Sequence, residues 1–126
     1  MKLKISNDLG DKPTGILYVL EIELEDKKLV KIGITNRKVE ERVCQILTEL
    51  WKKYRVFPRC YVARYKSVED NRKYEAILHE YFCQYKYTTE HKWGGYDEVL
   101  HLDVEVVKEA YDRLLDKGTL DEDSME

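Results

Sequence analysis

Two apolar runs on either side of a short charged segment constrain the fold of this chain more than any other feature. Residues 15–23 and 29–35 are rich in isoleucine, leucine and valine, and five of the six residues in 23–28 are charged. Two strand-like runs joined by such a turn predict a β-hairpin. Thr35 or Asn36 can cap a helix that begins directly after the second run.

A helix is predicted over about residues 38–54, because apolar residues recur there with the helical period. They form one stripe: Val39, Val43, Ile46, Leu47, Leu50 and Tyr54. Arg42 lies beside this stripe, where its stem can pack while its charged head reaches a cleft or simply the solvent. Tyr18 and Lys31 lie on the two preceding strands. We therefore expect local structure alone to bring this tyrosine, lysine and arginine near one another.

A third strand and a second helix are predicted next. Residues 60–65 alternate between the two faces of a strand, and residues 67–70 (Ser-Val-Glu-Asp) have the form of a capping box. The capping box predicts a helix over about residues 68–83. Glu75 lies at the edge of the apolar stripe of this helix, one turn before His79.

The last third of the chain predicts an extended segment over residues 96–102 and a helix over 104–117, which Gly118 ends. The expected order is two strands, a helix, a strand, a helix, an extended piece and a last helix. We expect one folded domain between two poorly ordered ends, with these boundaries: a lead-in over 1–13, the domain over 14–118 and an acidic tail over 119–126.

Length and composition exclude several classes of protein. A chain of 126 residues fits a single domain. Its apolar runs are too short to cross a membrane, and we expect no signal peptide. The three cysteines include no Cys-x-x-Cys pair, so we expect reduced thiols packed in the core of a cytoplasmic protein; they are Cys44, Cys60 and Cys83.

The charge is distributed unevenly along the chain. The net charge is −3, but residues 27–66 hold twelve Lys and Arg against three acids, whereas residues 67–126 hold seven against sixteen. A basic face in the middle third favours nucleic-acid binding, although lysines and arginines also simply solvate a helix face. The candidate phosphate contacts are Lys31, Arg37, Lys38, Lys52, Lys53 and Arg55.

The ordered motifs resemble the GIY-YIG nuclease family. Residues 15–18 read Gly-Ile-Leu-Tyr, and residues 31–33 read Lys-Ile-Gly, as in a phage-type branch with lysine in place of the second tyrosine of the family. Arg42 lies on the following helix, and Glu75 lies in a helix similar to the one that carries the glutamate of the family. The resemblance covers about residues 14–103. It implies an α+β fold with a small three-stranded antiparallel sheet flanked by helices.

The resemblance also implies a metal-dependent endonuclease that cuts DNA, or alternatively RNA. Glu75 would hold Mg²⁺ or Mn²⁺, and Arg42 would bind phosphate oxygens. Tyr18 would act as the general base, with Lys31 and Arg42 favouring its phenolate form. Many members of the family carry an asparagine after the glutamate helix. No asparagine follows Asn71 here, so that role is empty or another residue fills it.

Structural explanations and two other functions stay open. Tyr18 can be an ordinary strand aromatic, and Glu75 can pair with Arg72 or His79 on its helix. Trp93 and Tyr96 can stack on bases or pack in the protein. A nucleic-acid-binding module without chemistry or a protein-interaction module that uses the acidic last third are the alternatives. A single domain would take its sequence preference from loops, a homodimer or a partner.

Overall fold

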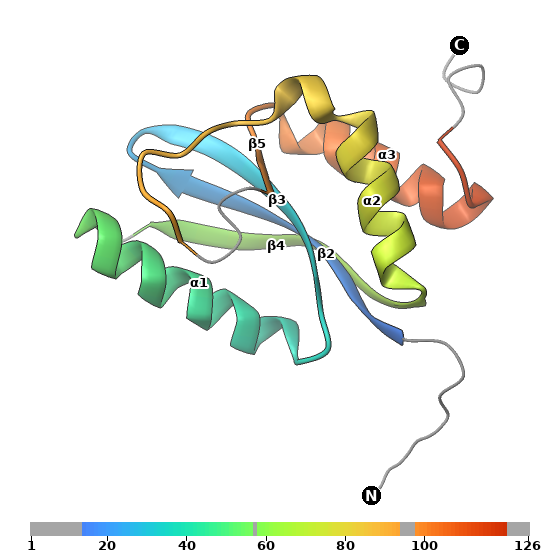
Figure 1. The fold of residues 1–126 in the computed structure, drawn as a ribbon, viewed down its shortest axis with the longest axis horizontal. Helices are drawn as coiled ribbons and strands as arrows, with labels where there is room; N and C mark the ends of the chain where they lie inside the picture. The colour runs from blue at the N-terminus through green and yellow to red at the C-terminus, as the bar shows by residue number, and fades with distance from the viewer. Residues whose placement is uncertain (1–13, 57, 94–97, 121–126) are drawn as a thin grey trace, which may run out of the picture.

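The computed structural model describes residues 14–56, 58–93 and 98–120 and has an α+β fold, as predicted (Figure 1). The predicted lead-in and most of the predicted tail lie outside the described residues. The elements in chain order are β2 (Thr14–Leu24), β3 (Lys27–Thr35), α1 (Val39–Tyr54), β4 (Arg59–Glu69), α2 (Asn71–Tyr81), the short 3-10 helix η1 (Cys83–Tyr85), β5 (Val99–Leu100) and α3 (Val104–Lys117).

The sheet is antiparallel with the strand order β4-β2-β3-β5. The three long strands are those that the sequence predicts, and the two-residue β5 adds a fourth beside β3. β2 lies between β3 and β4, so Tyr18 has Gly33 opposite it on one side and Tyr65 on the other. The register of β2 with β4 shifts between Val19 and Leu20. The long strand β4 is therefore an edge strand with one irregularity in its pairing.

The turn of the hairpin is shorter than the predicted six residues. β2 continues to Leu24 and β3 starts at Lys27, so only Glu25 and Asp26 connect the strands. Their φ angles are 52° and 68°, which is the backbone of a type I′ turn. This turn matches the right-handed twist of the two strands, so the pairing extends through the charged residues that flank it.

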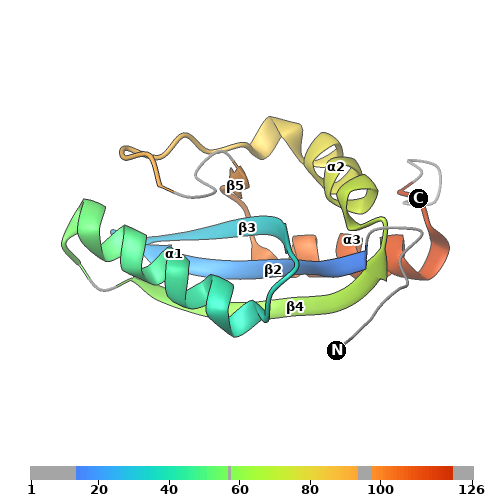
Figure 2. The same ribbon diagram turned by 60° about the horizontal axis from the view of Figure 1, so that its bottom comes forward.

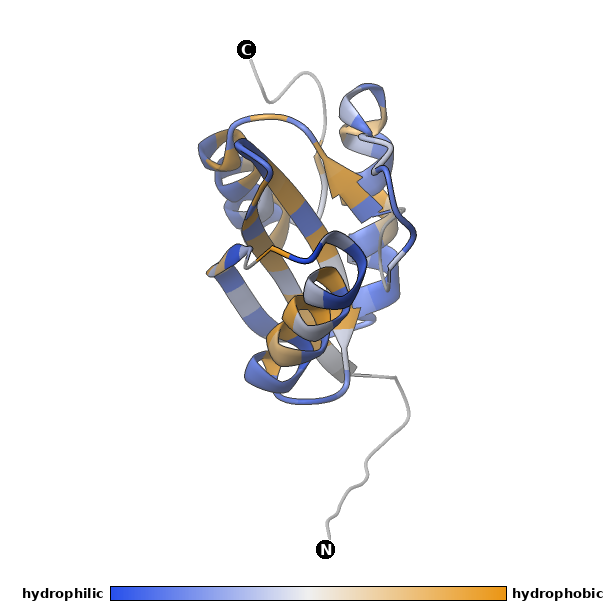
Figure 3. Ribbon diagram, turned by 90° about the vertical axis from the view of Figure 1, so that its left-hand side faces the viewer, coloured by the Kyte–Doolittle hydropathy of each residue, from blue (hydrophilic) through white to orange (hydrophobic). Residues whose placement is uncertain are grey.

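Helices cover both faces of the sheet (Figure 2). Helix α1 packs its residues Ile46 and Leu50 against Tyr18, Leu20 and other side chains on one face. Helices α2 and α3 cover the opposite face, where the alternate residues of the same strands meet them: Leu17, Val19, Val30 and Ile32. Coloured by hydropathy, the central strands carry the most apolar segments of the ribbon (Figure 3). Successive side chains of β2 point to opposite faces of the sheet, so this strand contributes to both hydrophobic cores.

The predicted capping box before the second helix is wrong. β4 continues to Glu69, and the helix starts at Asn71 after Asp70, whose φ of 57° is left-handed. The side chain of Asp70 makes no capping hydrogen bond. Val68 pairs with Gly15 of β2, so strand pairing overrides the local capping signal in this segment. The helix also ends at Tyr81, two residues before the predicted end, and η1 follows.

The ends of the other helices differ in how well the sequence predicts them. Neither Thr35 nor Asn36 caps α1: its N-cap is Lys38, and Thr35 Oγ1 instead accepts a hydrogen bond from the Arg37 N–H. The bounds of α3 agree with the prediction, and Gly118 ends it with a left-handed φ of 79°.

The predicted burial of the cysteines is wrong for two of the three and partly correct for Cys60. Cys60 is partly buried, whereas Cys44 and Cys83 are exposed, and all three thiols are free. Cys44 lies on α1 and Cys83 lies on η1, and each helix turns this position toward the solvent. Within the described part of the chain, no helix is long and apolar enough to cross a membrane.

Candidate active site

The side chains of Tyr18 and Lys31 cross above Gly33 on the face of the sheet that α1 covers. Tyr18 lies opposite Gly33 in the register, and Lys31 lies two residues before Gly33 on the same face. A Cβ atom added to Gly33 would lie 2.5 Å from Tyr18 Oη and 2.7 Å from Lys31 Nζ. The glycine of the Lys-Ile-Gly motif is therefore needed because it leaves space for these two side chains.

The hydroxyl oxygen of Tyr18 accepts hydrogen bonds from two cationic side chains. Lys31 Nζ donates at 3.0 Å, and Arg42 Nε donates at 3.3 Å from α1. The exposed fraction of both Tyr18 and Lys31 is 0%, while Arg42 is half-buried and also donates to Gln45. The predicted proximity of the tyrosine, the lysine and the arginine is confirmed. Their catalytic roles stay predictions.

Glu98 is a member of this cluster that the sequence analysis missed. Its Oε1 lies 2.7 Å from Lys31 Nζ, and its side chain is 34% exposed. Val99, the next residue, pairs with Lys31 across β3 and β5. Glu98 could have been identified only from the pairing of the next two residues, Val99 and Leu100, with β3. Nothing in the local sequence indicates that pairing, because Lys31 and Glu98 are 67 residues apart.

The charge of Lys31 also affects a thiol on β4. Burial raises the pKa of Cys60 to about 11, and the positive charge of Lys31 opposes that rise. Lys31 therefore interacts with groups from three other elements or their ends: Tyr18 of β2, Cys60 of β4 and Glu98 before β5.

Glu75 lies on α2, beside β3, the strand that carries Lys31 and Gly33. Its side chain is 17% exposed, and its Oε2 lies 4.0 Å from His79 Nε2. The same histidine nitrogen lies 3.0 Å from the backbone oxygen of Ile32, the residue between Lys31 and Gly33. His79 thus anchors this side of α2 to the motif strand, and Glu75 lies one helical turn before it.

The donor set fits a metal ion bound through few protein ligands. Among residues 14–56, 58–93 and 98–120, no group of three or more histidine, cysteine or acidic side chains could hold a metal. A single carboxylate such as Glu75 suits Mg²⁺ or Mn²⁺, which keep several waters and bind substrate phosphate oxygens. The expected ion would therefore bind weakly until substrate supplies further oxygens.

The predicted phosphate contacts do not form one compact patch. Arg37 and Lys38 precede α1, whereas Lys52 and Lys53 lie in its last turn and Arg55 directly follows the helix; all five are exposed. The two groups are about 20 Å apart along the helix axis. The shallow, open surface of α1 between them also carries the acids Glu40, Glu41 and Glu49. A phosphate would reach the fully buried Lys31 only if a neighbouring side chain moved.

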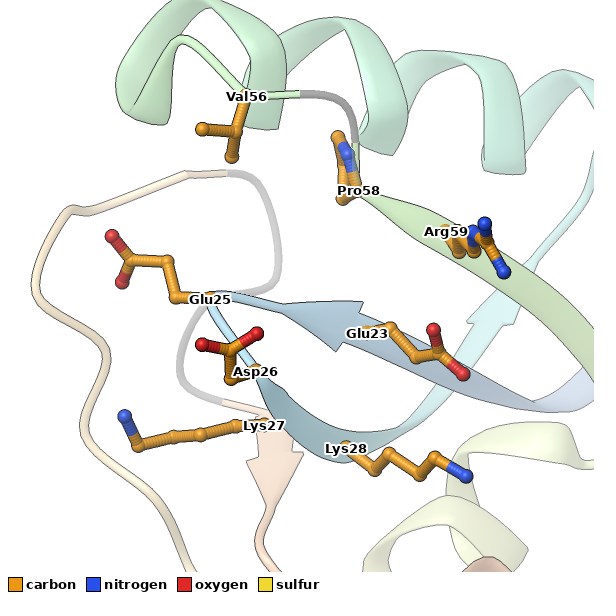
Figure 4. A pocket seen from close by; sticks show the side chains of 8 residues that line it. All are labelled: Glu23, Glu25, Asp26, Lys27, Lys28, Val56, Pro58 and Arg59. Carbon is orange, nitrogen blue, oxygen red and sulfur yellow. The ribbon is translucent and has the colours of Figure 1, made fainter.

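Another hollow of the surface is not lined by the tyrosine cluster, that is, by Tyr18, Lys31, Arg42 or Glu98. A pocket of about 330 Å³ lies at the tip of the hairpin, where the charged turn faces the segment between α1 and β4 (Figure 4). Its lining residues are Glu23, Glu25, Asp26, Lys27, Lys28, Val56, Pro58 and Arg59.

Trp93 is buried in the core under α1, so the structure gives it a packing role. Tyr96 lies outside the described residues.

A family model described as the T5orf172 domain matches residues 15–115, from the first residues of β2 into α3. This domain is phage-associated and is related to nuclease-like folds of the GIY-YIG type. No curated protein and no solved structure was found to match the chain.

Proposed function

We propose that this chain, which belongs to the T5orf172 domain family, is a metal-dependent endonuclease that hydrolyses phosphodiester bonds in DNA. The observation that carries the proposal is the phenol oxygen of Tyr18, which accepts hydrogen bonds from both Lys31 and Arg42. Two cations at one phenol favour its phenolate form. A phenolate next to a guanidinium that can bind phosphate is suited to deprotonating an attacking water.

In the proposed reaction, Tyr18 Oη takes a proton from water as the water oxygen attacks phosphorus. The bond from phosphorus to the leaving oxygen breaks, and that oxygen leaves as an alcohol after protonation by solvent. Because Tyr18 is fully buried, the reaction requires a neighbouring side chain to move first. Arg42 is suited to this movement, because its half-buried guanidinium can turn toward the phosphate while Lys31 remains bonded to the phenol oxygen.

Glu75 is the residue that would hold the metal ion. Mg²⁺ or Mn²⁺ there would neutralise charge that builds on the phosphoryl oxygens. The protein itself supplies the position of Glu75, which α2 holds beside the motif strand through the contact of His79 with Ile32.

The test is cleavage of single- and double-stranded DNA and RNA, with Mg²⁺ or with a chelator. We expect metal-dependent cleavage by the wild type, a loss of about 10²–10⁴-fold in rate for Tyr18→Phe, and no cleavage by Glu75→Gln. Tyr85→Phe and Glu80→Gln are matched controls, because both residues are exposed and lie outside the cluster. Full activity of Tyr18→Phe would remove the proposed base, and full activity of Glu75→Gln would remove the proposed metal ligand.

A nucleic-acid-binding module without chemistry is the second candidate function. One observation favours it: neither Tyr18 nor Lys31 has exposed surface, and a phenol that water never reaches cannot act as a base. In that case no substrate of the panel is cleaved, and Tyr18→Phe binds DNA as well as the wild type does.

The salt dependence of binding identifies the contact surface in either case. We expect log Kd to rise with log salt, with a slope that falls by about 0.9 for each phosphate contact to duplex DNA that is lost. Neutralising Lys52, Lys53 and Arg55 tests one end of α1, and neutralising Arg37 and Lys38 is the matched change at the other end. Binding that does not depend on salt would contradict a basic contact surface.

A further inference from the structure

We propose that Glu98 is a positioning residue that keeps Lys31 charged and directed at Tyr18. The carboxylate contacts the ammonium group at 2.7 Å, and the ammonium group contacts the phenol at 3.0 Å, so Lys31 Nζ bridges the two oxygens. The effect on the reaction rate rests on the proposed endonuclease function, whereas the effect on Tyr18 itself does not.

Burial explains why Lys31 needs this partner. Lys31 is fully buried, and burial disfavours the charged form of a lysine unless an opposite charge compensates. Arg42 adds a second positive charge at the same phenol oxygen, which makes a charged Lys31 still less favourable. The carboxylate of Glu98 supplies the opposite charge in contact with Lys31, and its side chain is 34% exposed.

The backbone fixes Glu98 in place although β5 has only two residues. On one side, Val99 and Leu100 pair with Lys31 and Val30 of β3. On the other side, the Tyr87 N–H donates to the Val99 oxygen, and the His101 N–H donates to the Tyr85 oxygen. The residue that precedes β5 is thus carried by a strand held from both sides, as precise placement of a charged group requires.

The charged and titratable groups around Lys31 and Tyr18 determine in which direction the loss of Glu98 should shift the titration of Tyr18. Arg42 contacts Tyr18 from α1, Glu98 contacts Lys31 before β5, and the positive charge of Lys31 lowers the pKa of the Cys60 thiol on β4. If Glu98 acts by keeping Lys31 charged, its loss makes Lys31 neutral and the phenolate of Tyr18 harder to form. If Glu98 acts only as a nearby negative charge, its loss makes the phenolate easier to form.

The experiment is a pH titration of Tyr18 by nuclear magnetic resonance, with tyrosine labelled by ¹³C at Cζ and the Tyr18 signal assigned by its absence in Tyr18→Phe. In Glu98→Gln we expect the midpoint of the Tyr18 titration to move to higher pH. The rising limb of the pH–rate profile should move by the same amount, with a rate at neutral pH about tenfold lower for each unit of the shift. A shift to lower pH, or no shift in a folded variant, overturns the proposal.

A double-mutant cycle separates this role from a structural one. In the Lys31→Met background, Glu98→Gln should leave the Tyr18 titration unchanged, because the group through which Glu98 acts is gone. An equal shift in both backgrounds contradicts the proposal. Glu98→Asp retains the charge and should titrate closer to the wild type than Glu98→Gln does, and it serves as the test if Glu98→Gln does not fold. Glu90→Gln is the control for an exposed glutamate of the preceding segment.

The titration needs neither substrate nor metal, so the two proposals can fail separately. A protein that cleaves nothing but shows the upward shift in Glu98→Gln contradicts the endonuclease and supports the role of Glu98. A protein that cleaves DNA but shows no shift in Glu98→Gln supports the endonuclease and contradicts the role of Glu98.

Discussion

At the scale of single residues, Gly33 is the position where the smallest change should disturb the site most. A methyl group there would lie 2.5 Å from Tyr18 Oη, so Gly33→Ala must displace the phenol, Lys31 or both. We expect a loss of about 1–3 kcal/mol in the free energy of unfolding, the usual cost of overpacking. Urea unfolding measures that loss, and the Tyr18 titration should change with it.

Gly15→Ala is the matched control for this prediction. Its added Cβ would collide with Asn71 Nδ2, so it should destabilise the protein by a similar mechanism. Gly15 and Tyr18 lie on opposite faces of β2, because they are three residues apart. The Tyr18 titration should therefore be unchanged in Gly15→Ala. An unchanged titration in Gly33→Ala as well would show that the space above Gly33 does not hold the phenol in place.

The sequence predicts the members of the site that lie on consecutive elements. Tyr18, Lys31 and Arg42 were identified because a hairpin and the helix after it place their side chains together, and the hydrogen bonds confirm it. Glu98 was missed, since its position depends on β5 joining the edge of a sheet built much earlier in the chain. Local patterns carry no information about that pairing.

At the scale of elements, the hairpin turn offers a test of the backbone conformation. Glu25 and Asp26 both adopt left-handed backbone angles, with φ of 52° and 68°. Such angles cost little for asparagine and glycine and more for other residues. We expect the double change Glu25→Asn and Asp26→Gly to raise the free energy of unfolding by about 1 kcal/mol. Urea unfolding checks this, and a lower stability would contradict the turn type.

The start of α2 shows why the boundaries of elements are hard to predict from a sequence. Residues 67–70 carry a good capping signal, yet residues 67–69 extend β4 along β2. The strand gains backbone hydrogen bonds over its whole length, and these outweigh one capping interaction. By contrast, α3 has no strand to compete with it, so its bounds follow from its sequence.

At the scale of the whole molecule, the two cores make stability depend on pH in the alkaline range. Tyr111 of α3 donates a hydrogen bond to the Leu17 oxygen of the central strand at 2.7 Å, and burial raises the pKa of Tyr111. Burial also raises the pKa of Cys60 from 9.0 to about 11. Both groups lose their protons more easily in the unfolded chain. Their contribution to stability is therefore complete below the unfolded pKa and is lost as pH rises above it.

We expect the free energy of unfolding to fall as pH rises from about 9 to 11, the range where thiols and phenols of an unfolded chain lose protons. Tyr111→Phe should cost about 1 kcal/mol at neutral pH, because the Leu17 oxygen loses its donor. It should also make the fall above pH 10 less steep. Tyr85→Phe, at an exposed tyrosine, should leave both unchanged. An equally steep fall in Tyr111→Phe would show that other groups cause it.

The contacts of the tyrosine cluster also imply a sequence of events in time. Tyr18 bonds to Lys31 across 13 residues and to Arg42 across 24, whereas Lys31 bonds to Glu98 across 67. Contacts between distant residues close larger loops and form later during folding. As the chain is synthesised, the phenol can meet its two cations long before the carboxylate exists. The pair of Lys31 with Glu98 therefore forms only in a molecule whose last strand has joined the sheet, so its presence reports that the sheet is complete.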